Sequence, residues 1–140
     1  MITSLALIVS FDINNQSRLW IIGSLCVVAL ADNISDTLGI HIYQEGEFSS
    51  SQKVWRATLA NFITRLCVIM VFILFVVFLP PVLVAGISIL YGYLIITIIS
   101  YLVARKRNLA PKTTILEHII IASLVLGLSK YITYLIKLSF

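Results

Sequence analysis

The chain has 140 residues, of which 60% are hydrophobic and 11% charged, and its mean hydropathy is +1.06. Because a soluble domain carries roughly a quarter charged residues, this composition excludes an ordinary soluble fold. The net charge of +4 does not indicate nucleic acid binding, since much of the excess lies in one short loop, residues 105–112, between apolar segments.

Residues 1–11 are apolar but too few to cross a bilayer, and we expect a partial or interfacial helix there rather than a signal peptide. Four longer helices are predicted over residues 18–45, 53–79, 82–104 and 113–138. Pro80 and Pro81 end the second of them, because proline cannot donate a backbone hydrogen bond. We therefore predict a single all-α, polytopic integral membrane domain over residues 1–140, with about four transmembrane helices plus a short N-terminal helical fragment.

The basic loop at residues 105–112 predicts which side of the membrane each connection occupies. Lys and Arg concentrate in cytoplasmic loops, so this loop is expected to face the cytoplasm. Alternation then places the connector at residues 46–52 on the same side, and the turn at Pro80 and the C-terminus on the other. Cys26 and Cys67 lie in apolar segments without metal-ligand spacing, and they predict neither a disulfide nor a zinc site.

Two aspartates and one arginine fall deep inside the first two predicted spans. Asp32 and Asp36 are four residues apart, so we expect both carboxylates to face one neighbouring helix. Arg65 comes level with them on the next helix, and an isolated charge at mid-bilayer costs at least ~2.5–3.5 kcal/mol. We predict an ion pair between Arg65 and either aspartate. The pair can serve helix packing alone, and the remaining carboxylate is then protonated, hydrogen-bonded, matched by Lys130 or used to bind a cation.

A second polar group is predicted near the basic end of the bundle. His41 and Glu45 stand at the end of the first long helix, and Glu117 and His118 stand in the first turn of the last. Imidazole with carboxylate suits Mn, Fe or Zn, which makes these four residues candidate metal ligands. The alternative is a set of solvated interfacial residues, with Glu117 explained by the macrodipole at a helix N-terminus.

Three stretches together resemble the vacuolar iron transporter family across about residues 20–138. ADNISDTLG is similar to that family's second transmembrane helix, through Ala31, Asp32, Ser35 and Gly39. WRATLANFITRL resembles its third helix, and the loop ARKRNLAPKTT with ASLVLGLSKYITYLIKL resembles the approach to its fifth and that helix itself. The resemblance implies a homodimeric five-helix exporter of ferrous iron and related divalent cations, with proton exchange and metal ligands on the first two helices.

The chain also departs from that family's pattern. The first helix has no full counterpart, and the family's cytoplasmic metal-binding helices are reduced to the connector at residues 46–52. Asp36 stands where the family has methionine, and Ile40 stands where it has an acidic residue. The resemblance therefore carries over Asp32 alone as a path residue, with Asp36 as a harder, oxygen-type ligand beside it.

Two functions follow from these residues. The first is a small transporter-like membrane protein that moves divalent cations, iron or manganese, past Asp32 and Asp36 at the interface of a homodimer, with no resident cofactor. The alternative is a structural or partner-binding membrane protein with the same fold, in which the Asp and Arg charges serve helix packing. We do not expect an enzyme, because His41 and His118 are isolated and no HExxH or serine nucleophile motif is present.

Overall fold

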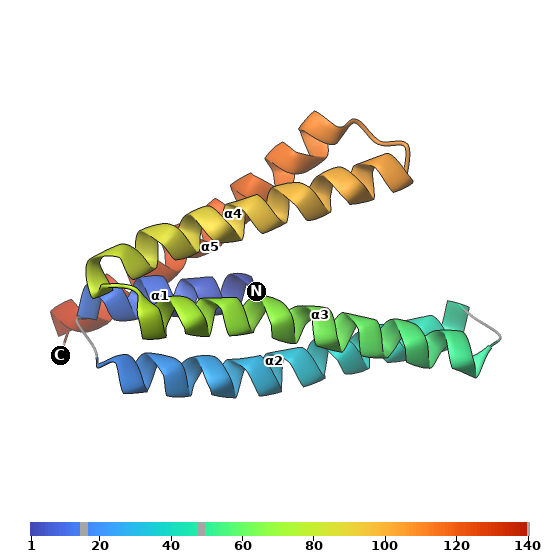
Figure 1. Ribbon diagram of the computed structural model, residues 1–140. Helices are drawn as coiled ribbons and strands as arrows, with labels where there is room; N and C mark the ends of the chain where they lie inside the picture. Colours follow the sequence, from blue (N-terminus) through green and yellow to red (C-terminus); the bar gives the residue numbers. More distant parts are fainter. Residues whose placement is uncertain (15–16, 48–49, 140) are drawn as a thin grey trace.

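The structure is a computed structural model that describes residues 1–14, 17–47 and 50–139, and within these ranges it contains five helices and no strand (Figure 1). They are α1 (Ile2–Asn14), α2 (Arg18–Glu47), α3 (Ser51–Phe78), α4 (Pro81–Lys106) and α5 (Pro111–Ser139). Helices α2 to α5 are each long and apolar enough to cross a membrane. The predicted all-α, multi-pass membrane fold is confirmed. Residues 48 and 49 of the predicted connector lie outside the described ranges.

The four long helices form two antiparallel hairpins, α2 with α3 and α4 with α5 (Figure 1). The hairpins meet where α3 turns into α4 at Pro80 and Pro81, and they diverge toward their other ends. We call the end with this turn the closed end. The open end holds the last turn of α2, the first turn of α3 and the loop between α4 and α5. The bundle is therefore V-shaped.

The loop at the open end of the second hairpin begins with a well-defined stop to α4. Asn108 has a φ of 53°, a left-handed conformation that asparagine tolerates better than most residues. The Leu109 N–H donates to the Ala104 carbonyl at 2.9 Å, and the Asn108 N–H donates to the Arg105 carbonyl at 3.4 Å. This is the Schellman pattern, which satisfies the last carbonyls of a helix. It presents the basic residues after Ala104 at the tip of the hairpin.

Helix α1 is a half-height helix that lies between the two hairpins in the closed half of the molecule (Figure 1). Leu5 and Ile8 are 0% and 1% exposed, and Ser4 and Val9 are also buried. Of the two predicted alternatives, the structure contains the partial helix, and this helix is buried among the others rather than interfacial. The physical reason is that residues 2–11 have no charged face to keep at a membrane surface, and a helix that is apolar all round is buried.

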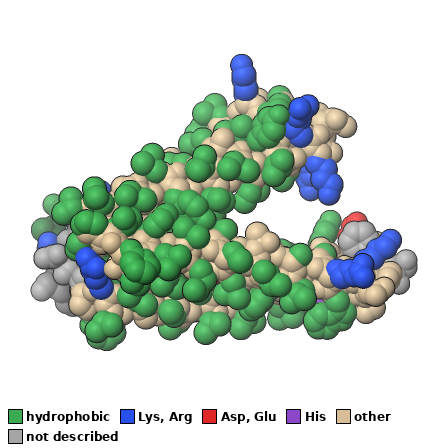
Figure 2. Space-filling model, in the orientation of Figure 1, with side chains coloured by type: hydrophobic (Ala, Val, Ile, Leu, Met, Phe, Trp, Pro, Cys, Tyr) green, Lys and Arg blue, Asp and Glu red, His purple; other side chains and the backbone are tan. Residues whose placement is uncertain are grey.

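The core of the protein lies in the closed half. The buried cluster joins α1 to every other helix through Leu5, Leu25, Phe72, Val84 and Leu126. Gly92 on α4 permits the close approach of α1, because a Cβ there would stand 2.8 Å from Leu5 Cδ2. The outward faces of the long helices carry exposed Leu, Ile and Val side chains (Figure 2), as expected of helices that contact lipid.

Candidate functional site between the hairpins

A cleft separates the two hairpins in the open half of the molecule, and Figure 2 shows it as a hollow between two arms. It consists of two adjoining cavities of about 480 and 220 Å³ that share Met1 and Ile99 in their linings. Residues of α2 and α3, among them Asp36 and Arg65, line the larger cavity. Residues of α1, α4 and α5, among them His118, line the smaller one.

The charged residues in this cleft lie at the middle of the span. At 1.5 Å per residue, Arg65 is about 21 Å from the start of α3 at Ser51 and about 20 Å from its end at Phe78. Asp36 lies about 16 Å from the end of α2 at Glu47, and Asp32 about 22 Å from it. The depth predicted from the sequence therefore holds for all three charges.

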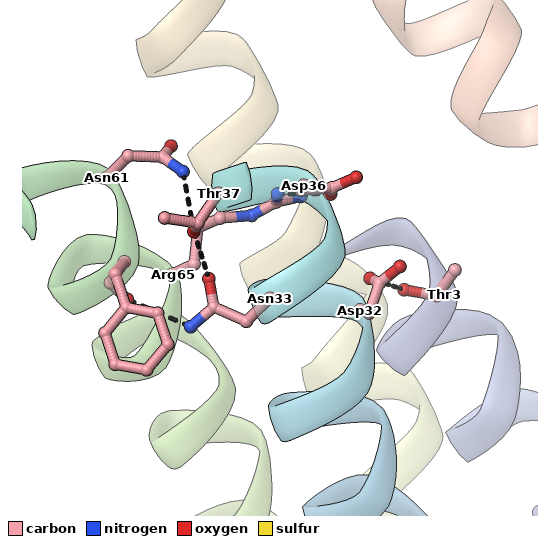
Figure 3. A network of polar contacts seen from close by, with 8 residues as sticks. Thr3, Asp32, Asn33, Asp36, Thr37, Asn61 and Arg65 are labelled. Carbon is pink, nitrogen blue, oxygen red and sulfur yellow. Dashed lines mark hydrogen bonds and ion pairs between the residues drawn. The ribbon is translucent and has the colours of Figure 1, made fainter. Parts of the chain in front are cut away.

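Arg65 forms an ion pair with Asp36, one of the two partners predicted for it (Figure 3). The Arg65 side chain is 28% exposed and the Asp36 side chain is 45% exposed. Because both also line the larger cavity, this exposure is toward the cleft. The pair neutralises two charges at mid-span and remains accessible to a small molecule or ion in the cleft.

Asp32 has a different partner, since it accepts a hydrogen bond from Thr3 Oγ1 on α1 at 2.8 Å (Figure 3). The expectation that both carboxylates face one neighbouring helix is therefore wrong. Helix α1 begins at the level of Asp32, so this aspartate meets α1, whereas Asp36 lies beyond α1 and meets the Arg65 side chain that reaches over from α3. Within one helical turn of α2, the partner helix therefore changes from α1 at Asp32 to α3 at Asp36.

An uncharged network, which sequence reasoning missed, joins α2 to α3 at the same depth. Asn33 Nδ2 donates to the Phe62 carbonyl at 3.0 Å, and Asn61 Nδ2 donates to Thr37 Oγ1 at 3.2 Å (Figure 3). Asn33 and Thr37 are buried, and Thr37 donates to Asn33 Oδ1 at 3.4 Å. Their spacing of four residues inside an apolar run is the signal that could have revealed them. This network holds α3 in the register that presents Arg65 to Asp36.

His41 and Glu45 lie away from the cleft. His41 lines a cavity of about 250 Å³ whose described lining comes from α2 and α3 only. Its Nδ1 is 2.8 Å from Thr58 Oγ1, its Nε2 is 3.3 Å from Glu45 Oε1, and its ring centre is 4.7 Å from that of Trp55. The histidine is thus held at the interface of α2 and α3 by a hydroxyl, a carboxylate and an indole.

His118 lies on the other hairpin and borders the cleft. Its Nδ1 is 2.7 Å from Ser100 Oγ on α4, and it lines the smaller cavity. The neighbouring Glu117 is exposed. Because α5 begins at Pro111 and has no acidic residue in its first turn, the predicted first-turn position of Glu117 and His118 is wrong. Among the residues that the structure describes, no three His, Cys, Asp or Glu side chains come together as a metal group. The predicted group of His41, Glu45, Glu117 and His118 is instead divided between the two arms of the V.

Lys130 is also away from the aspartates. It lines a shallow hollow with Gly127, Tyr131 and Tyr134, all on α5 toward the closed end. The polar side chains that line the larger cavity are the carboxylate of Asp36, the guanidinium of Arg65, the amide of Asn61 and the hydroxyl of Thr64. Carboxylate, amide and hydroxyl oxygens are suited to a hard cation, provided that Arg65 moves aside.

The geometry of the cleft is the main guide to the function of this chain. The likeness to the vacuolar iron transporter family rests on the sequence stretches described above, and it stays a prediction. The chain matches no protein-family model, no curated protein and no solved structure.

Proposed function

We propose that the chain is a small transporter-like membrane protein that moves divalent cations, Fe²⁺ or Mn²⁺, through the cleft and past Asp36 and Asp32. The observation that carries this proposal is the position of the Asp36 and Arg65 ion pair at mid-span, open to a cavity of about 480 Å³. Intramembrane carboxylates that face a cavity mark ion or proton pathways more often than they mark packing contacts.

Arg65 acts in this proposal as a movable counter-charge. While the cleft is empty of cations, the guanidinium neutralises Asp36 and avoids the cost of an isolated mid-membrane charge. An arriving cation replaces it, because the Asp36 carboxylate and the oxygens of Asn61 and Thr64 line the same cavity. Asp32 lies one turn deeper on α2 and exchanges its bond with Thr3 for the cation as the ion moves on.

A homodimer would supply the remaining ligands. The described part of one chain brings no three acidic or imidazole side chains together, whereas a divalent cation such as Mn²⁺ takes about six oxygen donors. Two copies joined near α2 double the aspartates at the path. Under this proposal the loop at residues 105–112 faces the cytoplasm, so the cleft opens to the cytosol.

The test is uptake of Fe²⁺ and Mn²⁺ into proteoliposomes that contain a fluorescent metal indicator, with and without a pH gradient. The Asp32→Asn, Asp36→Asn double variant should abolish uptake while it remains folded. The matched control is Glu45→Gln, which removes an exposed carboxylate outside the cleft and should leave uptake unchanged. If the well-folded natural protein shows no uptake, the transport proposal fails.

One observation favours the alternative of a structural or partner-binding protein. Arg65 already neutralises Asp36, and Asp32 already accepts a hydrogen bond from Thr3, so both carboxylates have partners within the chain. Under this alternative the double asparagine variant lowers thermal stability or yield, and it has no effect on the metal sensitivity of cells that produce the protein. The same variant therefore separates the two functions.

A further inference from the structure

The open end of the molecule is strongly basic on both arms of the V. Six exposed basic residues lie there, namely Lys53, Arg56, Arg105, Lys106, Arg107 and Lys112, against the three acidic residues Glu45, Glu47 and Glu117. Figure 2 shows Lys and Arg side chains at the tips of both arms, beside the mouth of the hollow. Arg105 is held along α4, because its Nε donates to Tyr101 Oη at 3.1 Å and its guanidinium stands 5.7 Å from that ring centre.

Apolar side chains line much of the cleft below this basic rim, beside the polar groups already described. Ile40 and Val68 line one side, and Ile96, Ile99 and Ile121 line the other. Ile99 and Ile121 are 50% and 54% exposed, so protein leaves about half of each residue's surface uncovered. An apolar surface of this kind favours contact with hydrocarbon over contact with water.

The depth of the cleft matches one leaflet of a bilayer. It runs from the open end to Arg65, about 21 Å along α3 from Ser51. Helix α3 is about 42 Å long and the hydrocarbon core about 30 Å thick, so about 6 Å of each end lies among the headgroups. The part of the cleft within hydrocarbon is then about 15 Å deep, which is half of the core.

We propose that the cleft binds an anionic phospholipid, with an acyl chain between the hairpins and the phosphate on the basic residues of the open end. Charge complementarity favours this occupant, because the rim has a net positive charge and an anionic lipid has a net negative charge. A zwitterionic lipid has no net charge. The phosphate also offsets rim charge that otherwise repels a cation. The inference rests on the rim and the walls rather than on the aspartates, and a lipid in the cleft must move aside for a cation to reach Asp36.

The first test measures which lipid the protein retains. The full chain is reconstituted in vesicles with equal parts phosphatidylcholine and phosphatidylglycerol, extracted in mild detergent and analysed by native mass spectrometry. The natural protein should retain phosphatidylglycerol in preference. The Arg105→Gln, Lys106→Gln, Arg107→Gln variant should reduce that preference by roughly fivefold or more. The control is Lys130→Gln, Lys137→Gln, which removes basic charge from α5 toward the closed end and should have no effect.

The second test asks whether the retained lipid lies inside the cleft. Ile99→Trp fills the space between the hairpins and should lower retention of phosphatidylglycerol, whereas Ile98→Trp, on an exposed neighbour that lines neither cavity, should not. Val68→Trp repeats the test from the opposite wall if Ile99→Trp does not fold by circular dichroism. Equal retention of the two lipids by the natural protein, or natural retention in the folded cleft-filling variants, would overturn the proposal.

Discussion

The closed and open halves of the molecule are built from the same four long helices, yet they differ in what lies between the hairpins. In the closed half α1 fills the space, and Leu5 and Phe72 are both 0% exposed. In the open half, beyond α1, the corresponding space is a cleft with the Asp36 and Arg65 ion pair at its bottom. The halves therefore differ in what joins one hairpin to the other: α1 contacts both hairpins in the closed half and does not reach the open half.

The comparison teaches where the protein gains stability and where it retains polarity. The closed half is held by close packing of apolar side chains, and its edge-on aromatic rings at Phe72 and Tyr91 have centres 5.4 Å apart. In the open half, hydrogen bonds of Asn33, His41 and His118 join the two helices within each hairpin. Substitutions in the two halves should therefore change the free energy of unfolding by different amounts and for different reasons.

The largest effect is expected in the closed half, at Phe72. Phe72→Ala should lower the free energy of unfolding by about 3–5 kcal/mol, because it leaves a cavity in a packed site. Phe78→Ala is the matched control, since Phe78 is 77% exposed and should change stability by less than about 0.5 kcal/mol. Denaturant unfolding in micelles, followed by far-ultraviolet circular dichroism, measures both. Equal losses would show that the closed half is not the packed core.

A smaller effect is expected in the open half, at Arg65. Arg65→Leu leaves the Asp36 carboxylate unpaired at mid-span, which should cost about 2.5 kcal/mol of unfolding free energy. The Asp36→Leu, Arg65→Leu double variant should recover much of that loss, because it leaves no unpaired charge. The same unfolding assay gives the coupling energy, with exposed Arg56→Leu as the control. Simple additivity of the two single losses would contradict the ion pair.

The smallest effect is expected where the two halves meet, at Thr3. Thr3→Val keeps the shape of the side chain but removes the hydrogen bond to Asp32, and single side-chain hydrogen bonds in membrane helices average about 0.6 kcal/mol. Thr113→Val, at an exposed threonine on α5, is the control. A loss above about 2 kcal/mol would mean instead that this bond is a main determinant of α1 docking.

Much of the fold was predictable because strong local signals specify it. Long apolar runs and the two prolines predict four helices over residues 18–45, 53–79, 82–104 and 113–138, and the observed helices begin and end within about two residues of these limits. The position of α1 was not predictable in the same way. Its sequence lacks a polar face, and hydrophobicity alone does not distinguish a helix at the membrane surface from one buried among other helices.

The candidate site was predictable only in part, because it depends on where α1 begins along the length of the bundle. Residue spacing and depth correctly brought Arg65 level with the two aspartates, but the partner of each aspartate depends on where α1 begins. The grouping of His41 with His118 assumed hairpins in contact at the open end, and spacing along the chain carries no information about the angle between hairpins. Asn33 was missed because it carries no charge.

The two histidines have a further property that follows from the position of protons. Ser100 Oγ lies 2.6 Å from the Ile96 carbonyl oxygen, and Thr58 Oγ1 lies 2.8 Å from that of Val54, so each hydroxyl donates its single proton within its own helix. Nδ1 of His118 and of His41 must therefore donate in the bonds to these hydroxyls. The neutral His118 ring is then the Nδ1–H tautomer, with the lone pair on Nε2.

The two hairpins thus present the same imidazole nitrogen to different surroundings. Nε2 of His41 faces the Glu45 carboxylate, whereas His118 belongs to the lining of the cleft. A metal ion could therefore reach His118 only through Nε2, from the side of the cleft.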